Sequence, residues 1–233
     1  MSAARAHGLW LPPWAGATAL EVSVPVAETR PAGRPHTRRD VVRHRRRLLR
    51  PDEVVELDGV PVTSVARTWV DLAERLPLVD LVAAGDSARR VGADSAELDE
   101  MIGRAGHRRG VVRARAARDL LDPRARSRPE SHLRVQLVLG GLPKPEVNVP
   151  VTVDGEWLGE PDAVYREARL GIEYQGEVHA DPARMRRDIT RALDFAEHDW
   201  LLMMAGPDQV FRFPERFVRQ VRFEWTRRRH GRI

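Results

Sequence analysis

The sequence predicts an α/β protein in two parts, a small α+β domain followed by an α/β domain. Apolar side chains recur at spacings of three and four over residues 63–122, which is typical of amphipathic helices packed on a shared core. Beyond that region, the pattern changes to the order helix, three strands, helix, strand. Asp122-Pro123 and the arginines after it form a basic connector, so we expect the domains to span residues 1–122 and 123–233.

The first domain is expected to begin with short strands and to continue with helices. Strand-like segments are expected at residues 19–26, 40–45 and 54–57. Asp58-Gly59 is a hairpin signal directly after the last of these. Four helices are expected to begin at Thr63 or Ser64, at Pro77, near Asp94 and near Val111. Trp69 lies on the apolar face of the first helix, so we expect it in the core.

Residues 30–50 carry nine arginines and two histidines against one acidic residue, Asp40. One interpretation is a surface that contacts phosphates. The other is a solvated strand edge, where charges keep strands of different molecules from pairing. The sequence leaves both open.

The second domain begins with a helix whose start is well marked. Ser127 and Glu130 have the spacing of a capping box, and Pro129 lies in the first turn. Asp154-Gly155 and Glu167-Ala168 are expected turns between successive strands. The expected elements are a helix over 127–140, strands over 147–151, 157–166 and 170–174, a helix over 181–198, a strand over 200–204 and a helix from Pro214.

The overall charge is basic, with a formal net charge of +5, and Lys144 is the only lysine. Arginine suits phosphate groups and base edges because its planar guanidinium donates two parallel hydrogen bonds. A GC-rich genome produces the same composition without any such purpose. The charge therefore indicates DNA as a partner only weakly.

Composition also excludes several kinds of site. The chain has no cysteine, so disulfides, thiolate zinc sites and cysteine nucleophiles are excluded. Any metal must bind oxygen or imidazole, which favours magnesium or manganese. No apolar run reaches about 18 residues, and Pro12, Pro13 and Glu21 interrupt the segment nearest to a signal peptide. We therefore expect a cytoplasmic protein with no membrane partner.

A polar cluster is predicted within the sheet of the second domain. A symmetric hairpin around Glu167-Ala168 places Asp162 opposite Glu173, and Gln175 lies on the same face two residues further on. Ile172 and Tyr174 then point the other way, into a core. Two opposed carboxylates repel each other unless a cation lies between them, and a divalent metal ion would supply that charge. The alternative is a pair of surface carboxylates neutralised by arginines.

These residues belong to a longer string that resembles a nuclease family. Its parts are Glu130-Ser131-x-x-Arg134, Gly141-Leu142-Pro143-x-Pro145, Gly159-x-Pro161-Asp162, Ile172-Glu173-Tyr174-Gln175-Gly176-x-x-His179 and Asp188-x-x-Arg191. The string covers about 110 residues and resembles the PD-(D/E)xK nuclease superfamily, in particular the DUF559 and Vsr-like endonucleases. The resemblance implies a metal-dependent DNA endonuclease whose Mg²⁺ (or Mn²⁺) is bound by Asp162 and Glu173. Gln175 stands where the superfamily most often has lysine.

The same resemblance implies roles for further residues. Glu130 would add a carboxylate to the site, although its place in a capping box explains it equally well. His179 would act as a base or contact phosphate, or it is an incidental loop residue. Arg134 would contact DNA. Arg191 would reach the site or the DNA, or it pairs with Asp188 within one helix.

A second resemblance lies upstream. Gly59-x-Pro61-Val62-Thr63-Ser64-x-x-Arg67-Thr68-x-x-Asp71-Leu72-Ala73 resembles the middle segment of AbiEi-like antitoxin proteins. In those proteins a winged helix usually comes first, and residues 3–9 resemble only its tail. The leading hypothesis is an endonuclease behind an AbiEi-like accessory domain that lacks a complete winged helix. The alternative is a non-catalytic DNA-binding or antitoxin-type regulator on a degenerate nuclease fold. DNA is the expected partner in both, and a homodimer is a possible assembly.

Overall fold

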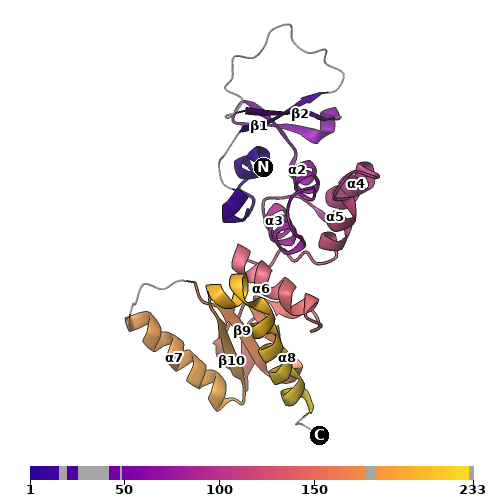
Figure 1. The fold of residues 1–233 in the computed structure, drawn as a ribbon. Helices are drawn as coiled ribbons and strands as arrows, with labels where there is room; N and C mark the ends of the chain where they lie inside the picture. Colours follow the sequence, from indigo (N-terminus) through magenta and orange to yellow (C-terminus); the bar gives the residue numbers. More distant parts are fainter. Residues whose placement is uncertain (16–19, 26–41, 48, 177–181, 231–233) are drawn as a thin grey trace. The chain divides into compact units, whose positions relative to one another are not determined.

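The structure, a computed structural model, describes residues 1–15, 20–25, 42–47, 49–176 and 182–230 (Figure 1). The chain forms two compact units, Met1–Leu121 and Asp122–Ile233. Each unit is described by itself below. Within the described ranges, no helix combines the length and the apolar content that crossing a bilayer requires.

The first unit combines two small sheets with a group of helices (Figure 1). Its elements are α1 (Ser2–Ala6), η1 (Pro13–Ala15), β1 (Leu20–Pro25), β2 (Val42–Arg47), η2 (Pro51–Glu53), β3 (Val54–Leu57), β4 (Val60–Thr63), α2 (Val65–Leu72), α3 (Leu78–Arg90), α4 (Ser95–Ala105) and α5 (Val111–Arg118). β1 and β2 pair in parallel, whereas β3 and β4 form an antiparallel hairpin. The four predicted helices and the described parts of the predicted strands are confirmed, residues 19, 26, 40 and 41 lie outside the described residues, and α1 was not predicted.

Local signals account for several of these boundaries. The β3–β4 turn has positive φ angles at Asp58 (51°) and Gly59 (76°), the backbone that a two-residue hairpin requires. The Ser64 hydroxyl accepts the N–H of Arg67 at 3.3 Å and so caps α2. Trp69 is buried, as predicted, and its Nε1 donates to the carbonyl of Leu81 at 2.9 Å, which joins α2 to α3.

A buried ion cluster joins α2 to the start of the β3–β4 hairpin. Arg67 is fully buried, and its guanidinium contacts Glu53 and, at 3.2 Å, the Asp71 carboxylate. Arg67 and Asp71 belong to the segment that resembles AbiEi-like proteins, so these two residues of the likeness have a structural role here. Removing either partner would leave a charge uncompensated in the interior.

The second unit contains a four-stranded sheet with the order β10-β9-β8-β5. Its elements are α6 (Arg128–Leu139), β5 (Glu146–Val147), β6 (Val151–Val153), β7 (Glu156–Gly159), β8 (Ala163–Tyr165), η3 (Arg166–Ala168), β9 (Leu170–Tyr174), α7 (Pro182–Glu197), β10 (Leu201–Ala205), the π-helical turn η4 (Asp208–Arg212) and α8 (Pro214–His230). β10 runs parallel to β9, and the other pairs are antiparallel. β6 and β7 form a separate hairpin.

Two of the predicted strands were wrong in extent. The predicted strand over 147–151 divides into β5 and β6, because Asn148 has a φ of 49° and Pro150 lacks an N–H. The predicted strand over 157–166 divides into β7 and β8 around Pro161 for the same reason. The turn after β8 is wider than two residues, since it consists of η3 and Arg169, which has a φ of 43°.

Strand side chains alternate between two cores, one on each face of the sheet. Ile172 of β9 belongs to the core shared with α6 and α8, as predicted, and Tyr174 packs against that core. Val164, Leu202 and Phe195 belong to the other core, in which α7 takes part. Figure 1 shows α7 on one side of the sheet and α8 on the other. Glu173, between Ile172 and Tyr174, therefore lies on the face of the sheet that α7 covers.

Candidate functional site

The candidate site lies at the pair of strands β8 and β9, on the face of the sheet that α7 covers. Ala163 pairs with Ile172, which is the predicted register and places Asp162 across from Glu173. Asp162 directly precedes β8, and Glu173 is the fourth residue of β9. Sequence reasoning therefore located the two carboxylates correctly relative to each other along the sheet.

Asp162 is held by the neighbouring backbone. Its Oδ2 accepts the N–H of Tyr174 at 2.7 Å. Burial raises the pKa of Asp162 to about 7; the hydrogen bond from Tyr174 and the charge of Arg191 oppose this effect, while the negative charges of Glu130 and Glu173 add to it. Near neutral pH, the Asp162 side chain is therefore protonated in some molecules and ionised in others.

Glu173 is paired with an arginine of α7. Nη1 of Arg191 donates to Oε1 of Glu173 at 2.8 Å and lies 2.7 Å from Oε2. Both side chains are at least two-thirds buried, so solvent screens the pair only partly. Of the two interpretations of Arg191, the structure shows the one in which it reaches the site.

Gly159 leaves the room that Arg191 occupies. A Cβ at Gly159 would lie 2.8 Å from the Nε of Arg191, and the glycine φ of 150° is one that other residues rarely adopt. The guanidinium carbon of Arg191 lies over the ring of Phe195, 6.0 Å from the ring centre. Gly159 is part of the string that resembles nucleases, but sequence reasoning gave it no role. The sequence feature that could have indicated this role is a glycine inside a predicted strand.

Glu130 lies at the start of α6 and connects three segments. Its N–H donates to the hydroxyl of Ser127 at 3.3 Å, as a helix cap requires. Its Oε2 accepts the N–H of Arg126 at 2.7 Å and the Nδ2 of Asn148 at 3.0 Å. The predicted capping box was therefore half wrong, because the carboxylate reaches past Ser127 to the preceding residue. Asn148, which the sequence analysis missed, holds Glu130 near the strands.

The remaining predicted site residues are Gln175, Arg134 and His179. The N–H of Gln175 donates to the carbonyl of Ala205 at 2.8 Å, beyond the end of β9, and its side chain is half-buried. Arg134 is buried in α6, which leaves its guanidinium little surface for a DNA phosphate. His179 lies outside the described residues, as does much of the arginine-rich segment 30–50.

The carboxylates in this arrangement do not fit a metal site of three protein ligands. Over the described ranges, no group of three His, Cys, Asp or Glu side chains could hold a metal ion. Asp162 accepts a backbone hydrogen bond and Glu173 is paired with a guanidinium. Of these two carboxylates, only Glu173 has a positively charged partner.

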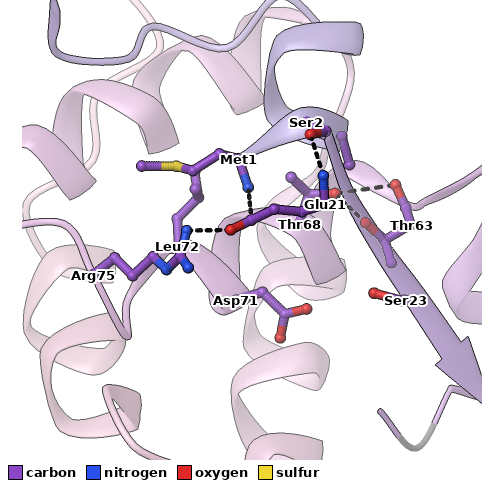
Figure 2. A pocket seen from close by; sticks show the side chains of 10 residues that line it. Met1, Ser2, Glu21, Ser23, Thr63, Thr68, Asp71, Leu72 and Arg75 are labelled. Carbon is purple, nitrogen blue, oxygen red and sulfur yellow. Dashed lines mark hydrogen bonds and ion pairs between the residues drawn. The ribbon is translucent and has the colours of Figure 1, made fainter. Parts of the chain in front are cut away.

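The first unit contains a polar cavity between α1, β1 and α2 (Figure 2). Glu21 lies at its centre, where Ser2 accepts its N–H at 2.9 Å and Arg75 contacts its carboxylate at 2.5 Å. Burial raises the pKa of Glu21, but hydrogen bonds from the Met1 amino group and Arg75 outweigh burial and hold the pKa below its usual value. The cavity has a volume of about 60 Å³, which suits a few water molecules better than a substrate.

Comparison with known proteins identifies relatives of the chain. Two Mycobacterium tuberculosis proteins, Rv2248 of strain H37Rv and MT2308 of strain CDC 1551, are each 32% identical to it over 167 residues. The matched region is 71% of this chain and 62% of each relative, so the chain matches less than two thirds of their length. No solved structure matches the chain.

A protein-family model covers the whole first unit. Residues 1–123 match the AbiEi antitoxin C-terminal domain. The match includes the hairpin, the buried Arg67 cluster and helices α2 to α5. It extends over more than half of the 233 residues, and the chain therefore belongs to the AbiEi antitoxin C-terminal domain family.

Proposed function

We propose that the chain is an antitoxin-type regulator that binds DNA and keeps a nuclease-like second unit without its catalysis. The observation that carries this proposal is the ion pair between Glu173 and Arg191, at 2.7 and 2.8 Å. The family match over the first unit supports the antitoxin part of the proposal.

The ion pair bears on catalysis because Glu173 is one of the two carboxylates that the nuclease resemblance makes a metal ligand. A guanidinium cannot lose its proton, so it remains a competitor of any cation for Glu173 at every physiological pH. Gln175 adds no positive charge where the superfamily has lysine. Asp162, whose pKa is raised to about 7, is only partly ionised at neutral pH. Three of the predicted catalytic positions, Asp162, Glu173 and Gln175, therefore favour a scaffold over a metal centre.

DNA binding is proposed from the charge of the exposed surface. The chain carries a net charge of +5, and α8 contributes a set of exposed arginines to the second unit. These are Arg216, Arg219, Arg222, Arg227 and Arg229. Arginines on a helix surface bind phosphates and release counterions, which gives affinity without sequence preference.

The test combines cleavage with binding. The full chain is incubated with supercoiled plasmid in magnesium, in manganese and in chelator, and its affinity for a labelled duplex is measured in the same buffers. The proposal expects a shift of the duplex without nicked or linear plasmid in any buffer. Plasmid cleavage that requires the metal and disappears in Asp162→Asn would overturn it.

The second candidate is the metal-dependent DNA endonuclease, with Asp162 and Glu173 binding Mg²⁺ or Mn²⁺. The negative charges of Glu130 and Glu173, which add to the effect of burial on the pKa of Asp162, favour this candidate, because a bound cation would relieve their repulsion. This candidate requires Arg191 to release Glu173. The cleavage assay above separates the two candidates directly.

A further inference from the structure

Helix α7 carries an exposed apolar stripe on the side away from the sheet. Met185, Ile189 and Leu193 are 61%, 56% and 58% exposed and recur every fourth residue. Side chains at this spacing lie on one face of a helix, one turn above the next. The other side of α7 is satisfied, since Phe195 is buried in a core and Arg191 is paired with Glu173.

Single exposed apolar residues are ordinary, but a continuous stripe is not. Val112, for example, is 74% exposed. Arg108 and Ala116 lie four residues before and after it, so no large apolar side chain lies next to it along the helix. Three large apolar side chains in line on one helix form a seam that resembles half of a helix pair. Such a seam is expected to pack against another apolar surface.

We infer that α7 pairs with α7 of a second copy of this chain, in antiparallel orientation. Charge selects this occupant. Beside the stripe, Arg186 lies near the beginning of the helix and Glu197 lies near its end. Antiparallel pairing brings the basic beginning of each helix beside the acidic end of the other, whereas parallel pairing brings like charges together.

The stripe fits a twofold axis near its middle residue. With Ile189 on the axis, Met185 lies beside Leu193 of the partner subunit and the reverse contact forms on the other side. α7 has 16 residues, which corresponds to a helix about 24 Å long. One helix from each copy makes a contact smaller than the standard interface of about 1,600 Å², so the dimer is expected to form reversibly with concentration.

The first test measures the mass of the full chain in solution. Light scattering or sedimentation over a range of concentrations should show a monomer–dimer equilibrium. Ile189→Glu places charges in the seam and should weaken dimerisation by about tenfold or more. Val112→Glu makes the same exchange at an exposed helix position of the first unit and should leave dimerisation unchanged. Circular dichroism and the thermal midpoint check that both variants fold. A chain that stays monomeric throughout, or equal loss in both variants, overturns the inference.

The second test uses the absence of cysteine in the chain to measure orientation. Copper-phenanthroline oxidises paired thiols to a disulfide. Ile189→Cys should give disulfide-linked dimers, and a mixture of Met185→Cys and Leu193→Cys chains should cross-link with each other more than either does with itself. A parallel pair predicts the opposite preference and contradicts the proposal. Failure of Ile189→Cys to cross-link while it reacts slowly with maleimide would show that another part of the same chain covers the stripe, which also overturns it.

Discussion

At the scale of single residues, the chemistry of the second unit depends on what satisfies two carboxylates. Glu173 has a guanidinium partner and Asp162 has a backbone N–H partner. The register that sets them opposite each other followed from sequence, because a hairpin relates residue numbers by simple pairing. The pairing with Arg191 did not follow, since it depends on how α7 packs on the sheet. Spacing within the helix instead predicts a pair between Arg191 and Asp188.

Replacing Arg191 tests the value of its ion pair. Arg191→Ala leaves Glu173 largely buried without its cation, so the free energy of unfolding should fall by roughly 1 to 3 kcal/mol. Urea unfolding in chelator measures this loss. Arg219→Ala removes an exposed arginine of α8 and should change stability by less than about 0.5 kcal/mol. Equal stability of the Arg191→Ala variant and the parent would show that the pair contributes nothing.

The raised pKa of Asp162 predicts a pH dependence with a definite sign. Its pKa rises from 3.8 in the unfolded chain to about 7 in the fold. The folded state therefore holds the proton more tightly, and the contribution is complete below about pH 4 and lost as pH rises through 7. From pH 5 to 8, the parent should lose about 1 to 4 kcal/mol of stability relative to Asp162→Asn, which cannot ionise. A constant difference between the two proteins would contradict the shift.

At the scale of elements, boundaries set by local chemistry were predictable. Asp58-Gly59 and Asp154-Gly155 both close hairpins through positive φ angles, and Ser64 caps its helix as its side chain suggests. Interruptions within strands were not predictable from alternation alone. The apolar pattern continues through Asn148 and Pro150, although the backbone there cannot continue a ladder. The parallel pairing of β1 with β2 also depends on contacts between distant residues.

Gly159 tests how closely β7 and α7 pack. Gly159→Ala would place a methyl group 2.8 Å from the Nε of Arg191 in a backbone conformation of positive φ. We expect a loss of about 2 to 4 kcal/mol, from strain and from displacement of Arg191. Gly155→Ala is the matched control, because its φ of 85° is strained but its Cβ meets nothing within 4 Å, so it should cost about 1 kcal/mol. Equal losses in both variants would mean that contact with Arg191 is unimportant.

At the scale of the whole molecule, the first unit matches a family and the second contains the candidate site. The family segment was recognisable from a string of residues over 59–73, which includes the Arg67 and Asp71 of the buried cluster. The balance between catalyst and regulator was not recognisable, since the same carboxylates suit both. Only the partner of each carboxylate in the folded chain favours one over the other.

DNA binding is expected to depend on salt. Counterion release makes the affinity for duplex DNA fall steeply between about 50 and 200 mM salt, with little dependence on sequence. Fluorescence anisotropy with two unrelated duplexes measures both properties. Arg216→Glu with Arg219→Glu, on the exposed face of α8, should reduce both the affinity and the salt slope. An affinity that stays flat over this salt range would exclude binding through phosphate contacts.

The most direct test of the regulator proposal is thermal unfolding of the full chain in chelator and in excess magnesium. A ligand that binds only the folded state raises the unfolding midpoint by mass action. Because Arg191 already neutralises Glu173, the midpoint of the parent should be the same in both buffers, and Asp162→Asn should be equally insensitive to magnesium. A rise of the parent's midpoint in magnesium that is absent in Asp162→Asn would show a metal site at these carboxylates and contradict the regulator proposal.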